Sequence, residues 1–266
     1  QNYRSTGNIL AAANALIANN TARLGKNLWT SGEQGEPVRI YAAFNERDEA
    51  DFVVNRIREW VAKGGRRSDA AILYRSNAQS RAFEEALLTA RIPYRVYGGL
   101  RFFERAEIKD ALAYLRLIFK RADDASCERI VNLPARGIGM KTLDTVRAYA
   151  RANTTSMWQA AGACIPDLGN RLGQNLHAFL ALIEQLDEQT RHLPLHEQVD
   201  HVIHASGLIA YYKQDKADRG EAKLDNLNEL VTAARGYEPD EASGMTPLAN
   251  FLAHAVLESG EDQADA

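Results

Sequence analysis

One stretch of the sequence combines, at short spacing, residue types that could bind phosphate groups. It reads Leu133-Pro134-Ala135-Arg136-Gly137-Ile138-Gly139-Met140-Lys141-Thr142-Leu143, between two segments of helical periodicity, which is the pattern of a helix-hairpin-helix. Because Gly137 and Gly139 have no side chain, the loop can bring its amides close to a phosphate at the start of the next helix. Arg136, Lys141 and Thr142 would add charge and a hydroxyl donor, and such contacts bind the nucleic-acid backbone without reading its sequence. A helical hairpin that needs glycines only for its bend is the alternative.

A second polar stretch, Tyr74-Arg75-Ser76-Asn77-Ala78-Gln79-Ser80-Arg81, follows a short apolar run at 70–74. Ligands of open parallel sheets gather at the carboxyl ends of the strands, so polar side chains are well placed here. Arg75 and Arg81 suit phosphates, and Asn77 suits a base edge or a sugar-phosphate. An ordinary strand-to-helix turn, capped by Ser76 or Asn77, is an equally good interpretation.

A third candidate is Gln1-Asn2-Tyr3-Arg4-Ser5-Thr6, immediately before a helical pattern. Arg4 could form paired hydrogen bonds with phosphate oxygens beside the positive end of the helix. The ring of Tyr3 offers a flat face for a purine. The alternative is that both side chains only pack against and cap the helix.

Other catalytic patterns are absent from the sequence. His196, His201 and His204 do not have the spacing of a zinc-binding helix, so we expect surface histidines and no metal site. There is no Gly-x-x-x-x-Gly-Lys-[Ser/Thr] phosphate loop and no glycine-rich dinucleotide fingerprint. Alone, this chain should not hydrolyse a nucleotide.

The elements around these residues divide into two kinds. Before Gly98-Gly99, apolar runs at 38–44, 70–74 and 93–97 alternate with helical patterns at 45–62 and 78–90. This order predicts part of a parallel sheet with helices packed on it, an α/β fold. A glycine pair suits a joint between two folded units, although an ordinary tight turn is the alternative.

After Gly98-Gly99 the pattern is all-helical, with Asp123, Asp124 and Ser126 as candidates for a helix cap. The predicted helices are 107–120, one that ends near 132–134, 141–151, 157–164, 172–189, 195–206, 208–213, 223–234 and 247–258. Two segments, 213–221 and 236–244, are predicted to be exposed loops. The fold class is therefore α/β followed by all-α.

Charge is distributed unevenly along the chain. The 266 residues carry a net charge of −3, with a net of +8 over residues 1–160 and −11 over residues 161–266. Any contact with a polyanion is expected in the first 160 residues. No apolar run reaches the roughly 18 residues needed to cross a bilayer, so no membrane partner is expected. Two distant cysteines, Cys127 and Cys164, suit a reducing cytoplasm.

Three blocks of this sequence resemble, in order, those of the UvrD/Rep/PcrA helicases of superfamily one. They are Gln-Asn-Tyr-Arg-Ser-Thr at 1–6, which is similar to the family's motif IV, Tyr-Arg-Ser-Asn-Ala-Gln-Ser-Arg at 74–81, and Gly-Gly-Leu-Arg-Phe-Phe-Glu-Arg-Ala-Glu-Ile-Lys-Asp at 98–110. The Gly-Ile-Gly hairpin also falls where these enzymes carry one. The resemblance covers essentially the whole chain.

The resemblance implies that residues 1–97 are the first, incomplete part of a second RecA-like motor domain, and that 98–266 are an inserted helical domain with DNA-contacting and regulatory roles. Arg4 would be a catalytic arginine at the ATP γ-phosphate, and Tyr3 would stack on adenine. Asn77, with Arg75 and Arg81, would contact single-stranded DNA. The loop from Arg136 to Thr142, including Ile138, would hold duplex DNA.

The implied parent is a bacterial, cytoplasmic, ATP-dependent 3′-to-5′ DNA helicase that uses ATP and Mg²⁺ to unwind duplex DNA in repair. With no phosphate loop, the fragment alone should be inactive and hold no bound cofactor. A non-enzymatic adaptor that recruits DNA-repair proteins is the alternative from another class. An exonuclease subunit of the same superfamily is a weaker one, because nothing in the sequence resembles a nuclease metal cluster.

Overall fold

The computed structural model describes residues 1–20, 27–96, 100–215 and 217–258. The chain divides into two compact units, Gln1–Phe52 and Val53–Ala266. The predicted joint at Gly98-Gly99 lies outside the described residues, and the predicted division at 97/98 stays a prediction.

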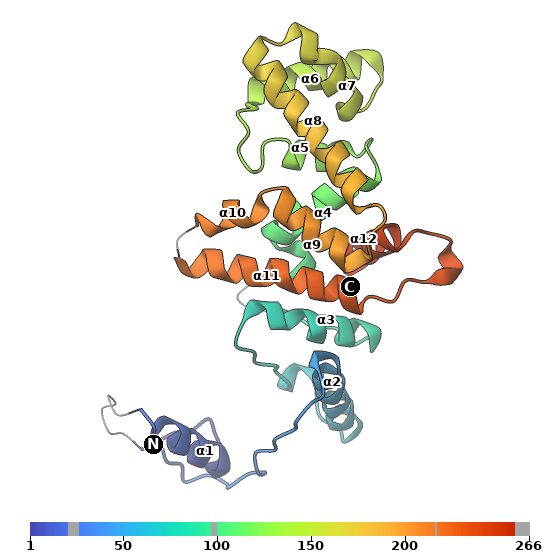
Figure 1. Cartoon of the computed structure of the whole chain (residues 1–266). Coiled ribbons are helices and arrows are strands. Elements are labelled where there is room, and N and C mark those ends of the chain that lie inside the picture. Colours follow the sequence, from blue (N-terminus) through green and yellow to red (C-terminus); the bar gives the residue numbers. More distant parts are fainter. Residues whose placement is uncertain (21–26, 97–99, 216, 259–266) are drawn as a thin grey trace. The chain divides into compact units, whose positions relative to one another are not determined.

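Helices account for all the regular structure of the described residues (Figure 1). The α-helices are α1 (Gly7–Ile17), α2 (Glu46–Ala62), α3 (Ser80–Thr89), α4 (Ala106–Phe119), α5 (Asp124–Ile130), α6 (Met140–Asn153), α7 (Met157–Cys164), α8 (Asn170–Thr190), α9 (Leu195–Ala205), α10 (Leu208–Lys213), α11 (Ala217–Gly236) and α12 (Pro247–Glu258). Short 3₁₀ turns are η1 (Arg67–Asp69), η2 (Asn77–Gln79), η3 (Phe102–Glu104), η4 (Ile165–Asp167) and η5 (Glu241–Ser243).

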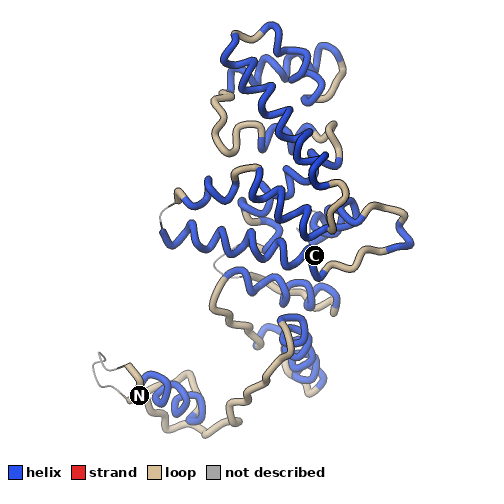
Figure 2. Tube along the Cα trace, viewed as in Figure 1, coloured by secondary structure: helices blue, strands red, loops and turns tan. Residues whose placement is uncertain are grey.

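The predicted parallel sheet is wrong. Figure 2 shows helices and loops but no strand in the described part of the chain, and the runs at 38–44 and 70–74 are irregular, as are the described residues 93–96. A strand exists only when its amides and carbonyls pair with a neighbouring strand. These runs find no such neighbour among the described residues, and the side chains of Ile40 and Leu73 are each 95% exposed.

In the first unit, α1 is held by the segment that follows it. The side chain of Asn14 donates to Leu28 O at 2.8 Å and accepts from Leu28 N at 3.0 Å. The amides of Gly7 and Asn8, at the start of α1, donate to the carbonyls of Glu33 and Gln34. The first turn of α1 therefore has protein acceptors for amides that a helix normally leaves free.

In the second unit, α4 is the central helix. It packs against α5, α8, α9, α11 and α12, and its side chains are almost all buried. Apolar residues recur along it at helical spacing, which is the pattern that predicts a buried helix. One continuous core extends from α4 through α6, α7 and α8, while Val54, Leu87 and Ile92 form a separate small cluster.

The helical predictions are confirmed in position throughout this unit, with shifts of a few residues at their ends. Asp123 caps α5 as expected, since its carboxylate accepts from the amide of Ser126 at 3.0 Å. The predicted loop at 213–221 is wrong from Ala217 onward, because α11 begins there. The predicted loop at 236–244 is irregular apart from η5.

An ion pair with a hydrogen bond lies at the end of α12. His254 Nε2 is 3.0 Å from Glu258 Oε1, and the imidazole also lies against the rings of Tyr237 and Phe103. The hydrogen bond to Glu258 raises the pKa of His254 above its ordinary value, against the opposing effect of burial. The pair fixes the last turn of α12 to the aromatic side chains beneath it.

We expect the substitution His254→Gln to lower the free energy of unfolding by about 1 kcal/mol at about pH 6 and to change it little at about pH 9. A histidine whose pKa rises on folding stabilises the folded state fully below its unfolded pKa of about 6.5. That stabilisation is lost as the pH rises through the folded pKa. Denaturant titrations at both pH values test this, with the exposed His192→Gln as the control. An equal loss at both pH values would contradict the assignment.

Candidate nucleic-acid interface

The loop between α5 and α6 is shaped by one side chain. Asn132 Oδ1 accepts from the amide of Arg136 at 2.7 Å and from the amide of Ile138 at 3.2 Å. The Ile138 side chain is 1% exposed and packs into the core. The loop is therefore fixed from the inside at Arg136 and Ile138, and Gly137 between them is exposed.

The remaining amides of this loop have no protein acceptor. Among the described residues, no hydrogen bond is made by the main-chain N–H of Gly137, Gly139, Met140 or Lys141. Gly139 is the residue that precedes α6, and Met140 and Lys141 are exposed in its first turn. Unpaired amides and the positive end of the helix dipole together favour an anion at this point.

The two glycines serve different purposes. Gly137 has φ of +72°, a conformation that side chains rarely adopt, and an added Cβ would lie 2.8 Å from Asn175 Nδ2. Gly139 has an ordinary extended backbone and open space within 4 Å of an added Cβ. Gly137 is thus required for the turn itself, whereas Gly139 keeps the outer side of the amides uncovered.

Arg136 points into the protein. Its guanidinium donates to Tyr114 Oη at 2.5 Å, and to the carbonyls of Ser206, Ile130 and Pro134 at 3.1 Å each. Tyr114 Oη in turn donates to Leu133 O at 2.6 Å. Burial raises the pKa of Tyr114 to about 12, so the phenol stays protonated and neutral.

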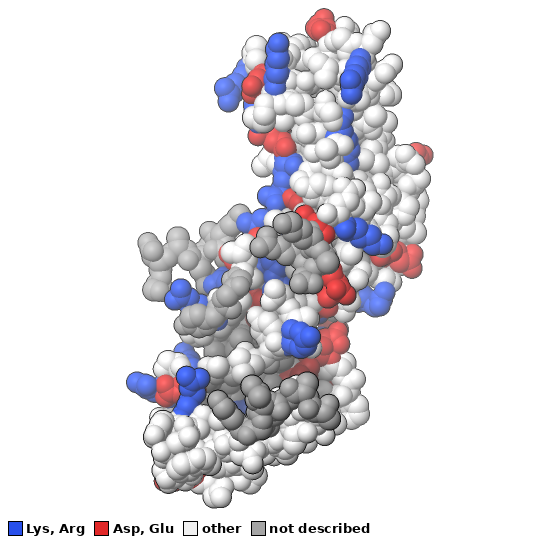
Figure 3. Space-filling model, turned by 90° about the vertical axis from the view of Figure 1, so that its left-hand side faces the viewer, with Lys and Arg blue, Asp and Glu red and all other residues white. Residues whose placement is uncertain are grey.

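The predicted DNA-binding residues of this stretch are therefore of two kinds, those that are exposed and those that bond or pack within the protein. Lys141 is exposed beside the free amides, whereas Thr142 and Ile138 are buried and Arg136 is bonded internally. Figure 3 shows Lys and Arg side chains, with Asp and Glu beside them, over the end of the second unit that α6, α7 and α8 form. The groups left for a ligand at this loop are the exposed side chain of Lys141 and the four unbonded amides.

The second predicted group, at 74–81, also contains both exposed residues and a residue that is bonded within the protein. Arg75 and Asn77 are exposed and, with Ser76 and Ala78, line one side of an open cavity of about 730 Å³. Glu221, Ala222 and Asp225 of α11 line the other side. Arg81 lies elsewhere, because its guanidinium pairs with Glu229 at 2.5 Å and with Glu85 at 2.7 Å.

The third group lies in the first unit. Tyr3 is 87% exposed, and the Arg4 guanidinium has no hydrogen bond or ion pair with any described residue. The amides of Arg4 and Ser5 both donate to Asn2 Oδ1, which fixes the main chain here. The first amides of α1 already have protein acceptors, so a phosphate at Arg4 would be bound by its side chain alone.

The histidines of α9 have ordinary protein partners. His201 Nε2 lies 2.9 Å from Gln189 Oε1, and His204 Nδ1 lies 2.9 Å from Asp200 O. Among the described ranges, no cluster of three or more histidine, cysteine or acidic side chains could hold a metal ion. Within the same ranges, none of the helices has the length and apolar character to span a membrane.

Sequence reasoning missed the residues that hold these surfaces in place, Asn132, Tyr114, Arg105 and Asn226. Asn132 carries a weak signal, since a short amide side chain often bonds main-chain amides in a turn. Arg105 lies inside the block at 98–110 that carried the family resemblance, but its contacts are with residues far away in the sequence.

The family described as "UvrD-like helicase C-terminal domain" matches residues 1–266. The chain is 56% identical over 268 residues to DNA helicase II of Escherichia coli strain K12, an alignment that covers 100% of this chain and 37% of the relative. It is also 56% identical over 267 residues to DNA helicase II of Haemophilus influenzae, which covers 99% of this chain and 37% of that relative.

A more distant relative is the ATP-dependent DNA helicase PcrA of Staphylococcus aureus strain Mu50, 40% identical over 266 residues, or 100% of this chain and 36% of the relative. The chain thus spans little more than a third of the length of the curated relatives it matches. The resemblance predicted from the three sequence blocks is confirmed. With the family matched over every residue, the chain belongs to the UvrD-like helicase C-terminal domain family.

Proposed function

We propose that this chain is part of an ATP-dependent DNA helicase that moves 3′ to 5′ and unwinds duplex DNA in repair, in the cytoplasm of a bacterium. Residues 98–266 contribute a helical domain that holds duplex DNA, and residues 1–97 contribute part of a motor domain and of its ATP site. The observation that carries the proposal is the group of free amides at Gly137, Gly139, Met140 and Lys141. The printed names of the relatives, DNA helicase II and ATP-dependent DNA helicase, support the activity of the longer protein.

Duplex DNA would be held through its phosphates. The amides of Gly137 and Gly139, at the positive end of α6, donate to phosphate oxygens, and Lys141 adds a positive charge. Arg136, bonded to three carbonyls and to Tyr114, keeps the loop in place and touches no phosphate. These contacts follow the sugar-phosphate backbone, so the grip is independent of base sequence.

Single-stranded DNA would enter the cavity at Arg75 and Asn77. The arginine suits a phosphate and the asparagine suits a base edge or a sugar. Arg81 has no part in this contact, since both of its partners are carboxylates of the same unit. Glu221 and Asp225 on the opposite wall repel phosphates, so the strand's backbone lies toward Arg75.

ATP would be held in part by Tyr3 and Arg4. The exposed ring and the unpartnered guanidinium fit the base and the phosphates of a nucleotide. When bound, ATP supplies the free energy of hydrolysis, and Arg4 stabilises negative charge on the transferred phosphoryl group. The described residues include no carboxylate cluster that fits Mg²⁺, so this chain's residues hold no metal in the proposal.

We expect the substitution Gly139→Val to weaken binding to duplex DNA by about tenfold, because its branched side chain covers the free amides. The fold has room for it, since nothing lies within 4 Å of the added Cβ. Fluorescence anisotropy with a labelled blunt duplex and a labelled oligothymidylate measures the effect, and single-strand binding should survive.

The control is Gly169→Val, because Gly169 also precedes a helix, α8, and also has open space around it. Equal weakening by both variants, or by neither, would count against the hairpin. A wild-type chain with no salt-dependent duplex affinity would instead favour the adaptor that recruits repair proteins.

Variants of Arg136 and of Lys141 should differ in how strongly their affinity for duplex DNA depends on salt concentration. We expect Lys141→Ala to reduce the slope of log affinity against log salt concentration by about 1, since a phosphate contact is lost. Arg136→Lys should weaken duplex binding by about tenfold at an unchanged slope, because a lysine cannot make the forked bonds that fix the loop. Duplex titrations at several salt concentrations, with Lys213→Ala as an exposed control, distinguish the two roles. A wild-type slope for Lys141→Ala would show that Lys141 contacts no phosphate.

In a full-length protein that contains this chain, Arg4→Ala should lower ATP turnover by a factor of about 10³ with little loss of DNA affinity. The matched control is Arg39→Ala, an arginine of the same unit whose side chain is also well exposed. Steady-state ATP hydrolysis in the presence of saturating single-stranded DNA gives the comparison. Normal turnover by the Arg4 variant would remove the ATP assignment and leave the duplex grip untouched.

A further inference from the structure

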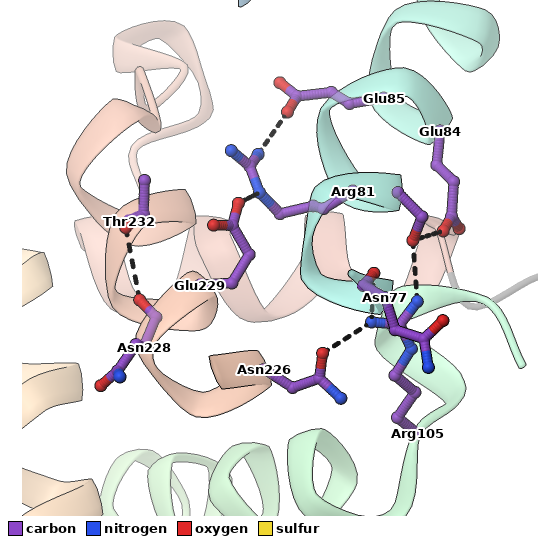
Figure 4. A network of polar contacts seen from close by, with 10 residues as sticks. Asn77, Arg81, Glu84, Glu85, Arg105, Asn226, Asn228, Glu229 and Thr232 are labelled. Carbon is purple, nitrogen blue, oxygen red and sulfur yellow. Dashed lines mark hydrogen bonds and ion pairs between the residues drawn. The ribbon is translucent and has the colours of Figure 1, made fainter. Parts of the chain in front are cut away.

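The guanidinium of Arg105 lies behind the candidate single-strand site and contacts three separate segments. Nη1 donates to Asn77 O at 2.8 Å and to Asn226 Oδ1 at 2.9 Å, and Nη2 donates to Ser80 Oγ at 2.7 Å. Figure 4 shows Arg105 directed at the Asn77 turn, with Asn226 of α11 on its other side. One side chain thus joins the loop before α3, the start of α3 itself, and α11.

Burial, an aromatic ring and hydrogen-bonded partners together restrain the side chain of Arg105. The residue is 7% exposed, and its charged group lies 5.3 Å from the centre of the Phe102 ring. Its partners are bonded further: Ser80 Oγ donates to Glu84 at 2.6 Å, and Asn226 Nδ2 donates to Glu107 at 2.6 Å. Burial lowers the pKa of Arg105, and the carboxylates of Glu84 and Glu107 oppose that effect. A buried guanidinium with every neighbour satisfied has one low-energy arrangement.

A second connection joins the same two helices. Arg81 of α3 pairs with Glu229 of α11 at 2.5 Å and with Glu85 at 2.7 Å (Figure 4). The arginine side chain of this pair is only 11% exposed. Helices α3 and α11 are therefore joined at two points, directly by Arg81–Glu229 and through Arg105, which bonds to Ser80 of α3 and Asn226 of α11.

These connections set the width of the cavity described above. One wall consists of the turn Arg75–Ala78, whose carbonyl at Asn77 is bonded to Arg105. The opposite wall is α11 at Glu221, Ala222 and Asp225. Asp225 is followed directly by Asn226, which is bonded to the same guanidinium. Arg105 thus bonds to both walls without lining the cavity.

We propose that Arg105 is a positioning residue, which holds the Asn77 turn at a fixed distance from α11 and so determines how tightly single-stranded nucleic acid binds in the cavity. The bond from the buried guanidinium to the carbonyl of Asn77 restrains the following peptide, and so fixes the turn that places Asn77 at the cavity. The inference rests on the proposed function, because it assigns a support to the single-strand site named there. Arg105 itself touches no nucleic acid.

The test uses the variants Arg105→Lys and Asn226→Ala in this chain, with a fluorescein-labelled oligothymidylate as the single-strand probe. Arg105→Lys keeps the charge but loses the fork, and Asn226→Ala removes the link to α11 alone. Each should weaken single-strand binding by about tenfold, with duplex affinity unchanged within about twofold. The salt slope for the single strand should stay as in the wild type, because no phosphate contact is removed.

Arg121→Lys is the matched control. Arg121 is also partly buried and bonded to main-chain carbonyls, Leu117 O at 2.6 Å and Ile118 O, and it pairs with Asp187 at 2.9 Å. It joins α4 to α8, away from the cavity, so its variant should bind the single strand as the wild type does. A combined Arg105→Lys and Asn77→Ala variant should bind no more weakly than Asn77→Ala alone, since both changes act on one contact.

The outcomes separate this inference from the function on which it rests. If Asn77→Ala weakens single-strand binding while folded Arg105→Lys and Asn226→Ala bind as the wild type, the positioning role is overturned and the single-strand site stands. If Asn77→Ala and Arg75→Ala also bind as the wild type, the single-strand site itself is wrong. An equal loss of single-strand and duplex binding would indicate general damage and overturn the positioning role. Circular dichroism checks folding, and should Arg105→Lys fail to fold, Asn226→Ala decides the result.

Discussion

Hydrogen bonds from two arginines, one half-buried and one buried, to main-chain carbonyls hold both candidate DNA-binding surfaces of the second unit. Arg136 bonds to the carbonyls around the Gly137–Gly139 loop, and Arg105 bonds to the carbonyl of Asn77. Burying a charge is unfavourable unless its donors are satisfied, so each arginine requires its surroundings to take one arrangement. The side chains that hold the two candidate DNA-binding surfaces in position are consequently not the side chains that are exposed to solvent.

The internal bonding of these segments also explains why few of their polar groups remain exposed to a ligand. Asn132 bonds to the amides of Arg136 and Ile138, and the Ile138 side chain fills the core. Among the described residues, this leaves for a ligand only the four unbonded amides named above and the exposed side chain of Lys141. On the other side of the unit, Arg81 is held by two carboxylates and Arg75 is left exposed. In both places some polar residues bond within the protein and hold the surface in position, while others stay exposed and can contact a ligand.

The sequence predicted the helices well and the strands badly, for a physical reason. A helix such as α4 or α7 makes its hydrogen bonds within a few residues, so its periodicity and caps are visible locally. The runs at 38–44 and 70–74 have the composition of strands, but a strand depends on a partner that composition does not specify. The helix-hairpin-helix was predicted because two glycines and a lysine lie close together, and it stays a prediction. The family of the chain was identified correctly from three ordered sequence blocks. The inward turn of Arg136 was not predictable, because it depends on Tyr114 and Ser206, which are distant in the sequence.

The anchoring of Ile138 has a thermodynamic consequence. A loop whose central side chain is fixed in the core has already lost its conformational entropy on folding, so none remains to be lost when a phosphate arrives. In the proposed function, association with a rigid double helix would then resemble the docking of two preformed bodies, in which the encounter rate depends mainly on long-range attraction. A loop built in this way would release and rebind successive phosphates along a DNA molecule without refolding at each step.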